Sequence, residues 1–347
     1  MSIVGQTQRF VTIRILPFVK QKHQPLFSFG IQALSLTAYE SLGSNARLII
    51  KNVNTANSKI YRLVRNKTLV HNFFRLVRET GLVTPVSLVN VDFSTFCGFE
   101  TLAFGVQTGK GRALPVWLAC LTYPITFAGS QNLFVLEQIQ AFGTILGFYP
   151  RFVFDRGFWI PLVMEFLLQH KSIFYLRIKQ GQTLQWVKIG KRKRAQTIGK
   201  HTKDAVITVF GYKMRLIVSP PPPKQTNPKK KQNTQRWYII TNDMESSREE
   251  ILVIYQTRFE IEETFKDYKH IQKLKVLRIK TTETFLILLW FATLGHWLAW
   301  WTGEKRGIPL IRAKEKRSFF RIFWEDLQRE LRTAGLTRIV SLRASPG

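Results

Sequence analysis

The sequence predicts an α/β protein built on a mixed sheet that is flanked by helices. Two apolar stretches, VSLVNVDFSTF at residues 86–96 and RFVF at residues 151–154, are typical of buried strands, and each leads to an aspartate. Between them, the stretch QNLFVLEQIQAFGTIL at residues 131–146 repeats its apolar residues at helical spacing. Strands that alternate with helices favour a sheet with helices on its faces.

The first part of the chain, residues 1–80, is predicted to be a small basic helical region. Apolar residues recur at helical spacing in SKIYRLVRNKTLVHNFFRLV, for which Ser58 is a candidate cap. We then expect a strand that ends at Asp92, a second strand in LPVWLACLTYP, the helix at residues 131–146, and a strand that ends at Asp155 before a glycine turn. Residues 81–169 and 241–301 are therefore predicted to form the main body of the protein.

Residues 170–240 have a different pattern and are predicted to be a β-rich insertion. Short alternating strands are interrupted by the charge run KRKR at residues 191–194 and by the loop PPPPKQTNPKKKQ, whose prolines cannot continue a central strand. Ser246 and Ser247 then precede a long helix. The apolar run 285–301 contains Thr293, Gly295 and His296 and falls short of a membrane span, so it is interpreted as a buried helix. Residues 302–347 are predicted to be a basic C-terminal helix and tail.

Charge points to a polyanionic partner. The chain has 347 residues, a formal net charge of +30 and 45% hydrophobic residues, so it can form a large core and still carry excess cations. Residues 1–80 hold a net charge of +10 and residues 170–236 a net charge of +16, whereas residues 81–169 are nearly neutral. A nearly neutral body with two basic attachments favours an enzyme or a folded DNA-binding protein over a structural RNA-binding protein.

Cysteine and histidine usage argues against a disulfide framework or a structural zinc site. Cys97 and Cys120 stand in apolar surroundings without the spacing of a metal motif, and the N-terminus lacks the apolar core of a signal peptide. We therefore expect both cysteines to fill a core, and we expect a cytoplasmic, nucleoid-associated protein that does not enter a membrane.

The most informative motif is IYQTRFEIEETFKDYKH, in which Tyr255, Arg258, Glu262 and Lys269 have the spacing Y-x2-R-x3-E-x6-K. On one continuous helix these four side chains lie within roughly 60° of one another. Apolar residues flank this stripe, while Glu260 and Asp267 are predicted to point the opposite way, toward solvent. An ionic stripe on the core side needs partner charges or bound metal.

Three carboxylates give this motif a chemical meaning. Asp92 and Asp155 follow apolar strands and Glu262 faces inward, so together they would concentrate about three negative charges that a divalent metal can neutralise. Two Mg²⁺ ions roughly 4 Å apart can activate a nucleophile and stabilise a leaving oxygen at phosphorus. Arg258 as a fork and Lys269 as a point charge would bind phosphate oxygens. The pattern predicts phosphodiester chemistry on DNA.

The segments VDFSTF, FVFDRGF and YQTRFEIEETFKDYK resemble those of DDE transposases of bacterial insertion sequences, in the branch with a Tyr-Arg-Glu-Lys signature. The residue after Arg258, usually tryptophan in that family, is Phe259. The resemblance implies a ribonuclease H-like core with a β-rich insertion before the glutamate helix. It also implies that Asp92, Asp155 and Glu262 hold two Mg²⁺ or Mn²⁺ ions, and that a homodimer in a synaptic complex cuts double-stranded DNA at terminal inverted repeats and joins it to target DNA.

Further DNA-binding residues are predicted around this centre. The resemblance assigns DNA contacts to Tyr255, Arg258 and Lys269. Trp237 is a candidate for stacking on an extruded base or a core residue, Trp186 is a weaker candidate, and Arg156 either touches phosphate or braces its loop. The basic run consists of Lys191, Arg192, Lys193 and Arg194. Two alternative functions are a catalytically inactive derivative that represses transposition and a stand-alone nuclease, which would not need Tyr255 and Lys269.

Overall fold

The protein is described from a computed structural model. The structure describes residues 52–66, 68–122, 130–221, 236–272 and 279–305, with residues 21, 24, 274, 321–322, 325–326 and 329. Most of the basic region 1–80, the proline-rich loop after residue 221 and the predicted C-terminal helix lie outside the described residues.

Ten strands form a mixed sheet in the order β3-β2-β1-β4-β5-β10-β9-β8-β6-β7. The chain divides into two compact units. Unit 1 comprises residues 1–83, 93–127 and 260–347, and unit 2 comprises residues 84–92 and 128–259. Strand β1 (Leu88–Phe96) and helix α10 (Phe259–His270) each contain residues of both units. A mixed sheet with flanking helices confirms the predicted fold class.

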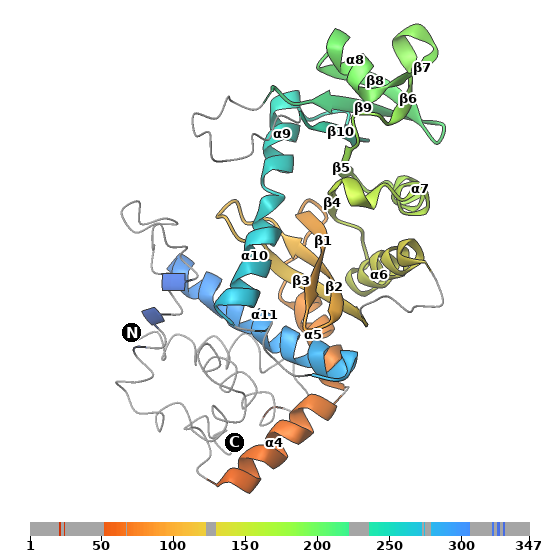
Figure 1. Ribbon diagram of the computed structural model, residues 1–347. Helices are drawn as coiled ribbons and strands as arrows, with labels where there is room; N and C mark the ends of the chain where they lie inside the picture. The colour runs from red at the N-terminus through yellow and green to blue at the C-terminus, as the bar shows by residue number, and fades with distance from the viewer. Residues whose placement is uncertain are drawn as a thin grey trace. The chain divides into compact units, whose positions relative to one another are not determined.

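In unit 2, the central strands are parallel. Strand β4 (Arg151–Phe154) pairs with β1 on one side and with β5 (Phe174–Ile178) on the other, both in parallel register. Helix α6 (Gln131–Leu146) begins after the cap Ser130 and ends at Gly147, which has the left-handed conformation that favours glycine. It packs beside α7 (Pro161–Gln169) (Figure 1). Strand β4 and helix α6 therefore match the elements expected from the sequence.

The rest of unit 2 is antiparallel. Strand β10 (Tyr238–Thr241) pairs with β5 on one side and with β9 (Tyr212–Val218) on the other. Strand β8 (Asp204–Val209) then pairs with β9 and with β6 (Thr183–Trp186). The charge run was expected to interrupt the strands, but it forms strand β7 (Lys191–Arg194), which pairs with β6 at one end of the strand order. At the edge of a sheet, four charged side chains can stay in solvent, and their charge keeps the strand from pairing with other chains.

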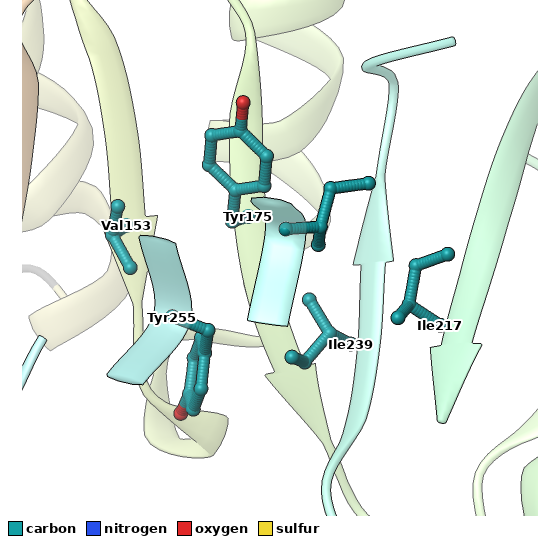
Figure 2. Close-up of a cluster of buried hydrophobic side chains, with 6 residues drawn as sticks. Val153, Tyr175, Ile217, Ile239 and Tyr255 are labelled. Carbon is teal, nitrogen blue, oxygen red and sulfur yellow. The ribbon is translucent and has the colours of Figure 1, made fainter. Parts of the chain in front are cut away.

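A buried cluster joins this sheet to the helix that follows it. Val153, Tyr175, Ile217 and Ile239 come from β4, β5, β9 and β10, and Tyr255 comes from α9 (Arg248–Gln256) (Figure 2). All of these side chains are fully buried. The cluster therefore holds α9 against one face of the strands in unit 2.

The start of α9 is defined by local hydrogen bonds. Ser247 caps the helix and forms a capping box with Glu250, as the serine pair before the predicted helix suggested. Just before it, the Asp243 carboxylate accepts hydrogen bonds from the Tyr175 hydroxyl and the Ser246 hydroxyl, each at 2.6 Å. These bonds lock the connection between β10 and α9.

Unit 1 combines helices with an antiparallel hairpin of β2 (Phe99–Val106) and β3 (Leu114–Thr122). Helix α4 (Val53–Arg65) begins after Asn52, whose side chain accepts from the Thr55 amide, so the expected cap at Ser58 was wrong because the helix starts a turn and a half earlier. Helix α5 (Thr68–Glu79) follows. It packs against α11 (Thr282–Lys305), where Phe73 stacks on Trp290.

Helix α11 contains the apolar run that was predicted to be a buried helix. Its residues Thr282–Trp301 are long and apolar enough to cross a membrane by length and composition, yet 78% of the most apolar window is buried within the protein. The buried-helix prediction is confirmed. Neither Cys97 nor Cys120 forms a disulfide within the part of the chain that the structure describes, and both are half-buried rather than fully enclosed in a core.

Candidate active site

Asp92 and Asp155 lie side by side in unit 2. The last register pair of β1 and β4 joins Val91 to Phe154, and the next residue along the chain after each of them is an aspartate. The strand was expected to end at Asp92, but β1 continues to Phe96 and only its pairing with β4 ends here. Parallel strands bring equivalent positions to the same level, and this explains why two aspartates 63 positions apart in the sequence meet.

Arg177 extends this row to a third strand. Phe154 is paired with Leu176 on β5, so Arg177 follows at the level of Asp155. Its Nη1 lies 3.9 Å from Asp155 Oδ1, and its side chain is only 15% exposed. Arg177 was not among the residues expected from the sequence, although a single charged residue in the apolar stretch FYLRI is a signal that could have indicated it.

The second ion pair joins Asp92 to Arg258, the arginine of the motif. Arg258 Nη1 lies 3.4 Å from Asp92 Oδ2, and the Arg258 side chain is 3% exposed. The Tyr255 hydroxyl donates a hydrogen bond of 3.1 Å to Asp155 Oδ1. Burial raises the pKa of Tyr255, so this hydroxyl stays protonated and remains a donor. Each aspartate is therefore held by a motif residue, and each faces a guanidinium group.

The predicted single helix is two helices. Helix α9 ends at Gln256 and α10 begins at Phe259, and the Asn90 side chain donates to the Thr257 carbonyl in the break at 3.4 Å. Tyr255 and Arg258 are buried, whereas Glu262 and Lys269 on α10 are half-buried. The spacing thus marked the right side chains but not the break between them.

Two other expectations for this motif were wrong. Glu260 and Asp267 were predicted to face solvent, but they are 5% and 4% exposed, while Phe259 is 39% exposed. The reason lies in the hairpin loop between β2 and β3, which covers this side of α10 within unit 1. There, Asp267 Oδ2 lies 2.5 Å from Arg112 Nε.

The Glu260 carboxylate is bound by the same loop. It accepts backbone hydrogen bonds from Thr108 at 2.8 Å and from Gly111 at 2.7 Å, and the Ala113 amide donates to the Glu260 carbonyl at 3.2 Å. Burial raises the pKa of Glu260, and the backbone N–H groups of the loop oppose that shift. Glu260 therefore anchors the first turn of α10, the turn that precedes Glu262.

The predicted metal site was tested against the side chains present. Among the residues that the structure describes, no group of three or more His, Cys, Asp and Glu side chains could hold a metal ion. Asp92 and Asp155 provide the carboxylate oxygens that Mg²⁺ prefers, and both sit beside cationic groups at ion-pair distances. This pair fits one part of a metal site, and the complete three-carboxylate site with Glu262 stays a prediction.

The remaining predicted DNA-binding residues are placed as follows. Trp237 is half-buried, with its ring 5.3 Å from that of Tyr255 and 6.1 Å from that of Phe259. Trp186 is 8% exposed and stacks on His201, as expected of a core residue. Arg156 is exposed and directly follows Asp155.

The cations of the motif and of the charge run lie in different surroundings. All four residues of the run Lys191–Arg194 are exposed on β7. In unit 1, the Lys269 ammonium lies 5.0 Å from the centre of the Phe96 ring. Arg258, in unit 2, has its guanidinium carbon 4.8 Å from the centre of the Phe259 ring. The β7 cations are therefore accessible to a ligand, whereas the motif cations pack against aromatic rings.

Comparison with known proteins agrees with this arrangement. Residues 135–298 match the family described as the transposase DDE domain, a range that includes Asp155 and Glu262 but begins after Asp92. The fold is similar to a chain in the "Cryo-EM structure of piggyBac transposase synaptic complex with hairpin DNA", with a TM-score of 0.51 and 10% sequence identity over 99% of this chain and 80% of that chain. That likeness shows the fold alone. No curated protein matches this sequence.

Over residues 135–298 the chain is therefore similar to DDE-type transposase domains, and it has the ribonuclease H-like α/β fold that the resemblance predicted.

Proposed function

We propose that the chain is a cut-and-paste DDE transposase of an insertion sequence, which cleaves DNA at terminal inverted repeats and transfers the freed strand to target DNA. The observation that carries this proposal is the row of Asp92 on β1, Asp155 directly after β4 and Arg177 on β5, in which Tyr255 contacts Asp155 and Arg258 contacts Asp92. A row of carboxylates and cations suits the cleavage of a phosphodiester. The cations can bind phosphate oxygens, and the carboxylates can hold the metal ions that promote cleavage.

Asp92, Asp155 and Glu262 are the residues that would hold two Mg²⁺ or Mn²⁺ ions. When bound, such ions activate a nucleophilic water or hydroxyl and stabilise the leaving oxygen. The chain's own residues perform the positioning. Tyr255 orients Asp155 through its hydroxyl, and Arg258 and Arg177 keep the two carboxylates close to fixed cationic groups.

The same arginines can bind DNA phosphate. A guanidinium group has five N–H donors, so it can bind a phosphate oxygen while it stays beside its carboxylate. Lys269, Trp237 and Arg156 would contact the strand near the cut. The exposed cations of β7 would bind the DNA backbone farther along, which is where a +16 segment is most useful.

We further propose that two copies act together on two DNA ends in a synaptic complex, in the cytoplasm and associated with the nucleoid. An inactive derivative that occupies the ends as a repressor is the competing interpretation. It would share the fold and the DNA-binding cations, and it would differ only in lacking metal-dependent cleavage.

The test is cleavage by single-carboxylate variants. Asp92→Asn, Asp155→Asn and Glu262→Gln should each abolish Mg²⁺- or Mn²⁺-dependent nicking of a supercoiled plasmid that carries the DNA flanking the gene, while DNA binding persists. Glu249→Gln is the control, because the Glu249 side chain is 73% exposed in the first turn of α9. Full nicking by any of the three variants would defeat the enzyme assignment, and a wild-type protein that binds but never nicks would favour the repressor.

A further inference from the structure

The turn between β8 and β9 contains an unusual residue. It is a two-residue loop, because Val209 pairs directly with Tyr212, and both of its residues have positive φ, 50° at Phe210 and 80° at Gly211. Such hairpin turns favour Asn-Gly, since asparagine and glycine tolerate this conformation. A bulky aromatic residue at the first position is a conformational outlier. Phenylalanine here is therefore not explained by the turn.

Phe210 is also more exposed than a core residue. It is 37% exposed, and Tyr212 beside it is 41% exposed. A partly exposed ring on a strained backbone position indicates a role beyond packing, because strain of this kind persists where function requires it.

Phe210 lies next to a second aromatic ring from a distant part of unit 2. The ring of Trp159 is 6.4 Å from that of Phe210, with 39° between their planes, and Trp159 is half-buried. Trp159 ends the short helical turn that begins directly after Asp155. Trp159 of this aromatic pair is thus only four positions along the chain from Asp155, an aspartate of the candidate active site.

Exposed cations flank both rings in the sequence. Arg156 stands in the same turn as Trp159, and Lys213 follows Tyr212 on β9. Aromatic rings with neighbouring cations suit single-stranded nucleic acid, because bases stack on the rings while phosphates meet the cations. The net charge of +16 over residues 170–236 also makes a polyanion the favoured occupant.

We propose that Trp159 and Phe210 form a stacking platform for an unpaired base of the DNA. This inference rests on the proposed function for its DNA substrate, and it assigns a site separate from the aromatic group of Trp237, Tyr255 and Phe259. The exposed Phe210 ring provides the stacking face, and Trp159 supports it from the Asp155 side.

The test compares duplex DNA that carries one unpaired 2-aminopurine with the same duplex fully paired, in EDTA so that cleavage plays no part. Phe210→Asn is the decisive variant, because Asn-Gly fits the turn better than Phe-Gly and the protein should melt at a higher temperature. We expect its affinity for the unpaired-base DNA to fall about tenfold, with little change for paired DNA. The 2-aminopurine fluorescence, quenched by wild-type protein, should recover. Phe210→Tyr should retain wild-type behaviour, and Trp159→Ala should resemble Phe210→Asn.

Three outcomes would overturn the platform: undiminished affinity of Phe210→Asn for unpaired-base DNA, an equal loss for both DNAs, or a changed oligomeric state, which would assign the ring to a subunit contact. These results do not depend on catalysis. If the carboxylate variants still nick plasmid while Phe210→Asn loses its preference, the enzyme proposal fails and the stacking site stands.

Discussion

Replacement of Glu260 by alanine should destabilise the protein far more than the same change at Glu263, three residues along the same helix. The Glu260 carboxylate is buried and accepts backbone N–H groups of Thr108 and Gly111. Removing it deletes two hydrogen bonds to a charged acceptor, from half-buried Thr108 and exposed Gly111, at about 1.5–3 kcal/mol each, so the expected loss is about 2–4 kcal/mol after water satisfies part of the loop. Glu263 is 39% exposed; it pairs with exposed Lys266 and, at 3.8 Å, with Arg112, and a partly exposed ion pair of this kind is worth less than about 1 kcal/mol.

The assay is urea unfolding followed by circular dichroism, with the free energies of Glu260→Ala and Glu263→Ala compared at unchanged m-value. Hydrogen exchange of the amides in residues 107–112 provides a local readout, because exchange there should accelerate in Glu260→Ala alone. Equal losses in the two variants, with unchanged protection of the loop, would refute the conclusion that Glu260 anchors α10.

Three other predictions concern DNA binding, pH and packing. Replacement of residues 191–194 by neutral residues should make DNA affinity less dependent on salt. The slope of log affinity against log salt concentration should fall by up to about one unit per lost phosphate contact, and an unchanged slope would exclude β7 from the interface. Burial alone would raise the pKa of Asp243, but hydrogen bonds outweigh it and lower the pKa to about 2. In acid unfolding, the wild-type protein should therefore have a higher free energy of unfolding than Asp243→Asn above about pH 4, and this difference should vanish toward pH 2. Gly143→Ala would place a methyl group 2.0 Å from the Tyr149 ring and should lower stability by about 1–3 kcal/mol, whereas Gly181→Ala, which meets open space, should not change the melting temperature.

The elements that sequence patterns predicted well are those whose signals are local. Helix α6 has an apolar period of its own, with a serine before it and a glycine after it, so its bounds could be derived directly. Strand β4 is a short apolar run that ends at an aspartate. In both, neighbouring residues carry the information, and the rest of the fold did not change the outcome.

The candidate site was predicted in part, for a physical reason. The spacing of Tyr255 and Arg258 pointed to the two motif residues that contact Asp155 and Asp92. The single charge in FYLRI was a local signal for Arg177, but its place beside Asp155 depends on the register of β5 against β4, which no local pattern encodes. Register is set by the packing of whole strands.

By itself, the sequence determined which residue types were available: three carboxylates after strands or on a helix, a basic insertion and a motif of fixed spacing. Only the tertiary structure decided which side of α10 is buried. Periodicity specifies the direction of a side chain around its helix, but burial depends on what packs there, and the loop that covers Glu260 comes from about 150 positions earlier in the chain. The break between α9 and α10 was likewise decided by contacts from another segment, since Asn90 on β1 binds the carbonyl exposed there.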